Sequence, residues 1–520
     1  MRRKNMPLRV KILKSRYYDS VKLLNVSKET SKLEGVEAAF LVMATDANKN
    51  LLASLNLMTN EVSYAGDDDL VIVVKATDEK IAESAINFAE RMLLTREGEE
   101  IKFESLEEAL SQIKDANLAM ISIPGKYVFE TAKKALENNL NLFIFSDNVP
   151  LKEEIELKKI ASSRGLLCMG PGCGTSILYG KVLGFGNVVN NGNIGIVGAS
   201  GTGIQEVSVL IDRYGGGITS AIGTGSNDMT RDVGGLTTNM ALKLLGEDDA
   251  TKSIVLVAKL PDVSVAREVL KIAASYKKPV IACFLGLEKE TFHGMETNVV
   301  VVDTLEDAAK QALKSVGITP PKDTLSPIMD QLVIKMKRLS DEQNYIRGVF
   351  SGGSLCYESQ LIIFKHLGRV YSNSPIKAEW KLADSMKSKE HTCVDMGAEE
   401  FTEGRAHPMI DPTLMKERII EECKDPHVGV ILFDTILGYG CHRDPASELC
   451  EAIAKGKSIA DREIIFITSV CGTKKDPQNY KYQLELLKEQ GVVVADSNAE
   501  ATKFAIYAIS RGNVKVGERL

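Results

Sequence analysis

The feature that most constrains the fold of this chain is the alternation of short apolar runs with amphipathic stretches along almost its whole length. Short, continuously apolar runs are typical of strands buried on both faces, and the amphipathic stretches between them are typical of covering helices. The pattern therefore predicts a doubly wound α/β fold with mostly parallel sheets, repeated along the chain. The clearest runs lie at residues 38–43, 70–75, 118–123, 142–146, 254–259, 279–286, 429–434 and 464–469.

The composition narrows the class of protein. At 520 residues the chain is long enough for about three or four domains. A net charge of −6 argues against general affinity for nucleic acid or an anionic membrane, and no window of 18 uninterrupted apolar residues predicts a membrane span. Nine cysteines without a C-x-x-C pair and six dispersed histidines predict reduced thiols, a cytoplasmic location and no metal site.

The most specific local motif is NIGIVGASGTGIQE at residues 193–206. Its apolar start predicts a buried strand, its glycine-rich middle a tight turn and its end a helix. Such a turn points backbone N–H groups and the positive end of a helix dipole at one place, beside the hydroxyls of Ser200 and Thr202. Each contact of this kind contributes about 0.3–2 kcal/mol, so the turn is expected to position a phosphate or carboxylate. The alternative is a helix N-cap that only makes a corner.

Two parts of the chain, 193–315 and 345–515, repeat the same order of motifs, and we interpret them as two copies of one α/β unit. The duplication gives two equivalent glycine turns that can face each other across an interface. A linker is predicted between the copies at 318–327, where three prolines fall close together. The matching segments are 194–203 with 346–355, 220–228 with 392–400, 254–260 with 430–436, 277–286 with 462–472, and 300–312 with 492–505.

Together these motifs resemble the succinyl-CoA synthetase superfamily. Residues 115–176, which include MGPGCGTS, resemble the second half of the CoA-binding domain of the α subunit, and 193–206 resembles the opening of that subunit's ligase domain. Residues 345–515 resemble the ligase domain carried by the β subunit. The SDN at 146–148 and GRAHPMIDP at 404–412 are characteristic of FdrA-type members of the superfamily.

The resemblance implies a domain plan. It consists of a modified CoA-binding-like Rossmann domain over 1–190, with 8–105 its least similar part, and two flavodoxin-like ligase-CoA domains over 191–317 and 345–520, joined by a linker over 318–344. By the resemblance CoA is a candidate cofactor, and the sequence alone establishes no cofactor.

The chain departs from a complete synthetase at two points. The lengths already assigned leave no stretch for a nucleotide-binding ATP-grasp domain. The synthetases carry a phosphorylated histidine in a Gly-His-Ala-Gly segment, whereas here His293 is followed by Gly294 and Met295. We therefore expect no phosphohistidine chemistry driven by this chain's own ATP.

FdrA-type proteins are implied, by the resemblance, to be one subunit of the oxamate carbamoyltransferase of anaerobic allantoin breakdown, acting with two further protein subunits. That enzyme interconverts carbamoyl phosphate plus oxamate with oxalurate plus phosphate. The step needs a held phosphate, a stabilised carbonyl oxygen and closely oriented reactants, which two glycine turns can supply in part. The alternatives are a CoA ligase subunit that relies on a partner for ATP, and a non-catalytic scaffold that binds an anion.

The candidate substrate-binding residues are those of three glycine-rich segments. For Cys173, in the segment 173–175, the alternative is a small packed residue rather than a nucleophile. The candidates are Ser200, Gly201, Thr202, Gly203, Ser351, Gly352, Gly353, Ser354, Cys173, Gly174 and Thr175.

The candidate catalytic residues are Arg405, His407 and Asp434. An arginine can grip a carboxylate with two hydrogen bonds, and a histidine can carry the proton of an attacking amide. Asp434 follows a buried apolar run and is expected either to orient a catalytic group or to cap a turn. For Arg405 and His407 the alternative is a surface loop.

Overall fold

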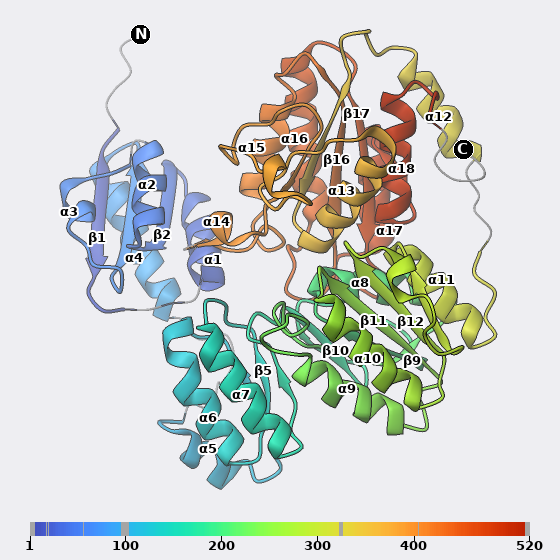
Figure 1. Cartoon of the computed structure of the whole chain (residues 1–520). Coiled ribbons are helices and arrows are strands. Elements are labelled where there is room, and N and C mark those ends of the chain that lie inside the picture. Colours follow the sequence, from blue (N-terminus) through green and yellow to red (C-terminus); the bar gives the residue numbers. More distant parts are fainter. Residues whose placement is uncertain are drawn as a thin grey trace. The chain divides into compact units, whose positions relative to one another are not determined.

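The computed structural model describes residues 6–16, 18, 20–55, 57–94, 103–321, 326–403 and 405–514. The chain divides into two compact units. Unit 1 comprises residues 1–105 together with 397–411, and unit 2 comprises residues 106–396 together with 412–520. The α/β class predicted from the apolar runs is confirmed, and the mostly parallel sheets predicted with it lie in unit 2 (Figure 1).

Unit 1 is built on a three-stranded antiparallel sheet in the order β1-β3-β2. Residues of α1 and α4 bury the apolar side chains of one sheet face, and residues from α2 to the start of β3 bury those of the other. The bounds are β1 Leu8–Leu13, α1 Ser20–Ser31, β2 Val36–Met43, α2 Asp46–Ser54, α3 Asn60–Ser63, β3 Leu70–Ala76, α4 Glu79–Leu94 and, in the inserted segment, α14 Glu399–Thr402.

This unit differs from the expectation that residues 1–190 form one Rossmann-type domain with parallel strands. β2 and β3 are neighbours and run antiparallel. Both strands are apolar on both sides because helices and loops cover each face of the sheet, and that burial produces the same sequence pattern as a parallel strand. Strand direction is therefore not encoded in these two runs.

Unit 2 begins with a small parallel sheet in the order β4-β5-β6, covered by α6 and α7. This segment corresponds to residues 106–170 of the region predicted as CoA-binding-like. Its elements are α5 Leu106–Gln112, β4 Leu118–Ile121, the 3₁₀ turn η1 Gly125–Tyr127, α6 Val128–Glu137, β5 Asn141–Ile144, α7 Leu151–Ser163 and β6 Cys168–Met169.

The next sheet of unit 2 has the order β13-β12-β11-β9-β10-β7-β8. Its parallel part follows the flavodoxin-type order 2-1-3-4-5, and the antiparallel hairpin β7-β8 extends the edge next to β10. The hairpin thus joins the sheet predicted to begin at 191 rather than the preceding domain. The elements are β7 Thr175–Leu178, β8 Lys181–Gly184, β9 Asn191–Gly198, α8 Gly201–Arg213, β10 Ile218–Gly223, α9 Leu236–Glu247, β11 Ser253–Lys259, α10 Val263–Ser275, β12 Val280–Leu285, η2 Lys289–Phe292, β13 Val299–Val302 and α11 Leu305–Ser315.

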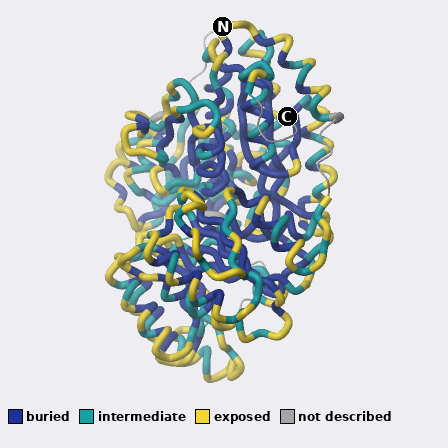
Figure 2. Tube along the Cα trace, turned by 45° about the vertical axis from the view of Figure 1, so that its right-hand side comes forward, coloured by how far each residue is buried: buried dark blue, intermediate teal, exposed yellow. Residues whose placement is uncertain are grey.

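The last sheet, β15-β14-β16-β17-β18, repeats the 2-1-3-4-5 order with all pairs parallel. The central strands β9–β12 and β14–β18 contribute most of their residues to the buried core, and buried residues are dark blue in Figure 2. The elements are β14 Tyr345–Phe350, α13 Gly353–Leu367, η3 Ala378–Trp380, β15 Thr392–Asp395, α15 Thr413–Glu422, β16 Val428–Ile436, α16 Pro445–Ala460, β17 Ile465–Cys471, α17 Tyr480–Glu489, β18 Val493–Ala495 and α18 Asn498–Ile509.

The predicted linker over 318–344 contains a helix. α12, Ser326–Met336, packs on α18 and β18 of the second copy. Three prolines suggested an irregular connection, yet the apolar residues that follow them form a helix, and Leu332 is fully buried. Residues 322–325 of this stretch lie outside the described part of the chain.

Candidate functional site

The first glycine turn begins helix α8 at the carboxyl end of β9. Ser200 is its N-cap, and the Ser200 hydroxyl accepts a hydrogen bond of 3.1 Å from the Gly203 amide. Among the described residues, the structure records no hydrogen bond from the amides of Gly201 or Thr202. The start of α8 therefore presents two backbone donors and a positive helix end, the arrangement predicted for an anion site.

The second glycine turn begins helix α13 at the carboxyl end of β14, but its donors are used within the protein. The Asp434 carboxylate on the adjacent strand β16 accepts hydrogen bonds from the amides of Ser351 (2.8 Å) and Gly352 (2.7 Å) and from the Ser351 hydroxyl (2.9 Å). Burial raises the pKa of Asp434 to about 6, and neighbouring Asp395 acts in the same direction. Of the two predicted roles of Asp434, this geometry matches the capping of a turn.

The two turns face each other across the two copies. The hydroxyls of Ser200 and Ser354 are 2.5 Å apart, and the Ser354 amide donates to the Thr202 hydroxyl at 3.3 Å. A methyl group built on Gly352 would lie 3.0 Å from the methyl carbon of Thr202, so the backbone of one turn lies against the side chain of the other. The structure thus brings both predicted turns together and leaves the donors of the first unpaired.

The third predicted segment lies beside the first turn. A methyl group built on Gly201 would be 3.2 Å from the Thr175 hydroxyl and 3.9 Å from the Cα of Gly174. Cys173 is buried, and its thiol lies 3.6 Å from the carbonyl oxygen of Thr175. Burial raises the pKa of the Cys173 thiol to about 11, so the thiol is protonated at neutral pH and matches a packed residue rather than a nucleophile.

Two buried glutamates hold the helices of the turns in position. The Glu206 carboxylate, on α8 of the first copy, accepts a hydrogen bond of 2.9 Å from the Asn498 amide at the start of α18 in the second copy. Reciprocally, Glu358 on α13 of the second copy accepts one of 2.7 Å from the Leu305 amide at the start of α11 in the first copy. Each copy therefore supplies a carboxyl oxygen that accepts a backbone amide at a helix N-terminus of the other copy.

These glutamates were not among the predicted residues, although the sequence carried a signal for them. Glu206 and Glu358 each lie five residues after the first residue of their helix, Gly201 and Gly353, so the repeat aligns them. Two acidic residues at equivalent positions on largely apolar helices indicate a shared structural constraint. Burial raises the pKa of both carboxyl groups, to about 8 for Glu358.

Arg405 and His407 lie in the segment 397–411, which is part of unit 1, whereas Asp434 and the glycine turns belong to unit 2. His407 is half-buried, its Nδ1 accepts a hydrogen bond from the Met409 amide, and burial lowers the pKa of its imidazole to about 4. Grouping Arg405 and His407 with Asp434 in one catalytic site stays a prediction. Gly404 of the same motif lies outside the described residues.

His293 is exposed in the loop that follows η2. The loop leads from β12 into β13, and the Arg267 guanidinium donates a hydrogen bond to the Thr291 carbonyl within it.

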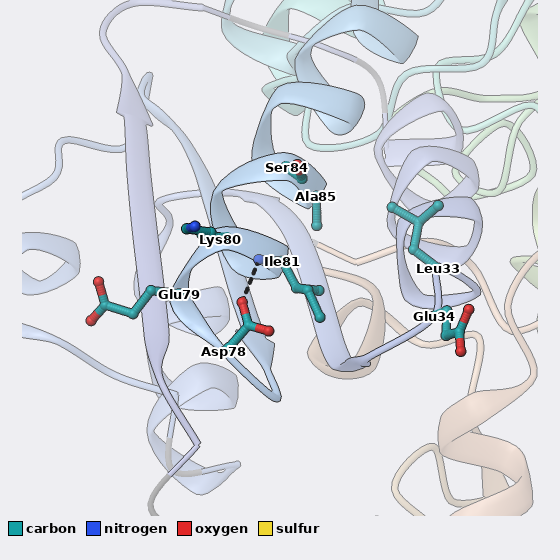
Figure 3. Close-up of a pocket in the computed structure, with 8 residues that line it drawn as sticks. All are labelled: Leu33, Glu34, Asp78, Glu79, Lys80, Ile81, Ser84 and Ala85. Carbon is teal, nitrogen blue, oxygen red and sulfur yellow. Dashed lines mark hydrogen bonds between the residues drawn. The ribbon is translucent and has the colours of Figure 1, made fainter.

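A surface pocket of about 650 Å³ lies in unit 1 between the end of α1 and the start of α4 (Figure 3). Its lining includes Glu34, Asp78 and Glu79, and Figure 3 shows the Asp78 carboxylate accepting the Ile81 amide at 2.9 Å. Because three carboxylates outnumber the single lysine, Lys80, the pocket does not suit an anionic substrate. It contains none of the predicted site residues.

Comparisons with known proteins divide the chain into three matched regions. Residues 6–109 match the model of the "AllF, heavy metal-associated domain", 189–286 match the CoA binding domain and 349–508 match the CoA-ligase domain. The last two are Rossmann-like and agree with the predicted succinyl-CoA synthetase likeness. The CoA-binding match falls on the first flavodoxin-type sheet, which the sequence patterns assigned to a ligase-like domain.

The name of the first model raises the question of a metal. Residues 6–109 contain neither cysteine nor histidine, the ligands that heavy metals prefer. Within the described part of the chain there is no group of three or more His, Cys, Asp or Glu residues that could hold a metal ion. The residues present therefore do not fit a heavy-metal site. In the same described part, every helix is too short or too polar to cross a bilayer.

Among curated proteins, the chain is 39% identical over 514 residues to the uncharacterized protein YahF of Escherichia coli (strain K12), covering 98% of this chain and 99% of YahF. It is 27% identical over 192 residues to the mitochondrial succinate–CoA ligase [ADP-forming] subunit alpha-2 of Trichomonas vaginalis, covering 35% of this chain and 60% of that subunit. The corresponding subunit alpha 2 of Archaeoglobus fulgidus is 26% identical, with 42% and 78% covered.

Among solved structures, the ATP citrate lyase from Methanothrix soehngenii in complex with citrate and coenzyme A matches with a TM-score of 0.35 and 17% identity. The match covers 42% of this chain and 42% of the lyase chain, so this chain spans less than half of that relative's length. A dinucleotide-forming acetyl-coenzyme A synthetase of Ca. Korarchaeum cryptofilum matches with a TM-score of 0.27 and 15% identity, covering 76% of this chain and 83% of the synthetase.

Proposed function

Since this chain belongs to the family of Escherichia coli YahF and carries CoA-binding and CoA-ligase domains of the succinate–CoA ligase type, we propose that it is the FdrA-type subunit of an oxamate carbamoyltransferase. The subunit acts in the cytoplasm with two further protein subunits. It helps to interconvert carbamoyl phosphate plus oxamate with oxalurate plus phosphate. The proposal rests above all on the start of α8, where the unpaired amides of Gly201 and Thr202 lie beside the hydroxyls of Ser200 and Ser354.

The reaction places defined demands on such a site. The amide nitrogen of oxamate attacks the carbamoyl carbon, a C–N bond forms, and the C–O bond to phosphate breaks. One proton of the attacking nitrogen leaves with the phosphate, so that oxalurate and hydrogen phosphate are the products. No electrons are exchanged, and negative charge accumulates on the departing phosphate oxygen.

The start of α8 supports this step by holding the phosphoryl group. Two backbone amides and one hydroxyl of the Ser200–Ser354 pair can donate to its oxygens, since the other hydroxyl hydrogen joins the two serines, and the helix dipole favours the growing charge. The contact between the two copies keeps these donors fixed, because Ser354 is anchored to Thr202 through its own amide. Fixed donors stabilise charge better than mobile ones, since they need no reorganisation during the reaction.

Arg405 and His407, which belong to unit 1, stay the sequence-based candidates for a carboxylate grip and a proton carrier. With its pKa lowered to about 4 by burial, the His407 imidazole is neutral at pH 7, and its Nδ1 accepts the Met409 amide. Substituting either residue is expected to lower oxalurate formation without changing the binding of phosphate to unit 2.

A second candidate function, a CoA ligase subunit that takes its phosphoryl group from a partner, is supported by the matched CoA-binding and CoA-ligase domains. CoA, when bound, would supply a thiol for thioester formation, and the unpaired amides at the start of α8 fit one of its phosphate groups. The exposed His293, followed by Gly294 and Met295, argues against this candidate.

Both candidates are tested in one experiment on the full chain with its two expected partner subunits. Oxalurate formation from carbamoyl phosphate and oxamate is measured beside CoA- and ATP-dependent thioester formation. The double variant Ser200→Ala, Thr202→Ala is expected to raise the KM for carbamoyl phosphate about ten-fold, because the Ser200 hydroxyl and the Thr202 hydroxyl that anchors Ser354 are both lost. Unchanged kinetics in this variant, or thioester made with phosphorylated His293, contradicts the carbamoyltransferase assignment.

A further inference from the structure

The carboxyl end of β11 carries a lysine for which the described part of the chain shows no carboxylate partner. Lys259 is the last residue of β11 and is half-exposed. No ion pair of Lys259 is recorded among the described residues, and its Nζ lies 5.9 Å from the centroid of the Tyr357 ring. A cation in this position is available to an anion from solution.

Tyr357 adds a second donor at the same place. It lies on α13 of the second copy and is almost fully buried, yet its hydroxyl has no hydrogen-bond partner among the described residues. The hydroxyl lies against the backbone of Gly286, where a built methyl group would be 3.0 Å from the Tyr357 Oη. A buried hydroxyl without a partner has lost its hydrogen bond to water, so an acceptor that reaches it restores one.

These two donors lie next to the glycine turns. The carbonyl of Val257 on β11 accepts the Ala199 amide at 2.9 Å, so Lys259 lies two residues beyond the point where β11 is joined to the start of the first turn. On α13, Tyr357 comes three residues after Ser354, and residues three apart share one side of a helix. Ser354 contacts Ser200 of the first turn, so the side of α13 that carries Tyr357 also contacts the first turn.

We propose that Lys259 and Tyr357 bind the carboxylate of a small amide acid, next to the phosphate held at the start of α8. The inference rests on the proposed function. It assigns the phosphate of one substrate and the carboxylate of the other to two neighbouring parts of one site. The lysine neutralises the carboxylate and the tyrosine hydroxyl donates to one of its oxygens. Lys259 comes from the first copy and Tyr357 from the second, so the site is complete only when both copies are assembled.

The test is a titration of the full chain with oxamate and, separately, with inorganic phosphate. Lys259→Met is expected to weaken oxamate binding about ten- to a hundred-fold, since a charge-assisted contact is lost, and Tyr357→Phe about ten-fold. Both variants are expected to bind phosphate as the parent chain does. Tyr357→Phe is expected to keep the parent's melting temperature, because the hydroxyl that it removes has no partner in the free protein.

Lys243→Met, which removes an exposed lysine on α9, is the matched control and is expected to leave oxamate binding unchanged. Arg405→Met decides between the two carboxylate assignments. The inference is overturned if oxamate binding survives in both Lys259→Met and Tyr357→Phe, if only Arg405→Met weakens it, or if the parent chain binds phosphate but not oxamate.

The same variants separate this inference from the proposed function. If the assembled complex makes oxalurate and its KM for oxamate is unchanged in Lys259→Met, the site assignment fails while the function stands. If the complex makes no oxalurate but oxamate binding depends on Lys259 and Tyr357, the function fails while the site stands.

Discussion

At the scale of single residues, Asp434 makes the two glycine turns chemically unlike. Its carboxylate takes the amides of Ser351 and Gly352, the position that a bound anion would otherwise take at the second turn. The aligned position in the first copy is Ala258, which has no group to offer. The first turn thus keeps its amides open, whereas the amides of the second turn are bound by Asp434 of the same copy.

Removing the Asp434 carboxylate should open the second turn. In Asp434→Ala the two amides lose their acceptor, and we expect the free protein to be destabilised by about 1–3 kcal/mol. Inorganic phosphate should then raise the melting temperature of the variant more than that of the parent chain, because it occupies the vacated position. Differential scanning fluorimetry across a phosphate series measures this, and an equal shift in both proteins contradicts it.

A second residue-scale constraint is the fully buried Lys158 on α7. Its ammonium donates to the Thr224 carbonyl and the Asp228 carboxylate, both at 2.7 Å, and lies 3.4 Å from Glu154. Asp228 in turn accepts the amides of Thr237 and Thr238 at the start of α9. One lysine thereby joins the small β4-β5-β6 segment to the first flavodoxin-type sheet.

Lys158→Met is expected to destabilise unit 2 by about 3–5 kcal/mol, because it leaves two buried carboxylates without their cation. Urea unfolding followed by circular dichroism measures the loss. Lys159→Met, one residue further on and exposed, is the matched control and should change stability by less than about 0.5 kcal/mol. Similar losses in the two variants would show that the network does not join the segments.

Some site residues near the strand ends could be predicted from the sequence, and others could not. Ser200 and Ser354 were found because glycine turns after apolar runs leave a local signature. Lys259 and Tyr357 were missed because neither belongs to a motif, and their proximity depends on how α13 packs near β12. Such contacts follow from the assembly of the two copies, which a linear pattern does not encode.

At the scale of elements, the two copies contact each other through helices of each copy. α8 packs beside α11 in the first copy and α13 beside α18 in the second, while α8 and α13 meet between them. The reciprocal carboxylates of Glu206 and Glu358 lie at this junction. The predicted order of elements is confirmed in both copies, since each has the strand order 2-1-3-4-5.

The Glu358 carboxylate makes the helix junction sensitive to pH. Burial raises the pKa of Glu358 from 4.5 to about 8, so the folded protein binds a proton there that the unfolded chain releases above pH 4.5. The stability contributed by this group is fully present below about pH 4.5 and is lost as the pH rises through about 8. Each unit of raised pKa corresponds to about 1.4 kcal/mol.

Glu358→Gln removes this titration, and its free energy of unfolding should therefore fall less between pH 5 and pH 9 than that of the parent chain. Urea unfolding at a series of pH values measures the slope. Glu268→Gln, which neutralises an exposed carboxylate, should keep the parent's slope. Parallel slopes in Glu358→Gln and the parent chain would mean that Glu358 is ionised in the folded protein throughout this range.

At the scale of the whole molecule, the sequence did not reveal that unit 1 is assembled from two distant stretches. Residues 397–411 are inserted between β15 and α15 of unit 2, yet they cluster with residues 1–105. The motif GRAHPMIDP was noticed as a family signature, but nothing in its local pattern indicates which part of the chain it packs on. Long-range packing of a loop depends on the complementary surface, which lies some 300 residues away in sequence.

Because unit 1 contains both stretches, we expect residues 1–105 to protect the inserted segment 397–411 from proteolysis. In the full chain, trypsin should cleave slowly after the half-buried Arg405, whereas a chain that begins at Leu106 should be cut there at least about ten-fold faster. Mass spectrometry of timed digests locates and times the cut. Equal rates in the two proteins would mean that the segment holds its structure without residues 1–105.

The reciprocal placement of Glu206 and Glu358 also limits how the two copies can change by substitution. Each copy supplies a hydrogen-bond acceptor to a helix of its neighbour, so a substitution that destabilises one copy also destabilises the other, and the two must change together. Encoding both copies in one polypeptide fixes their supply at one to one, and neither half is made without the other that completes it.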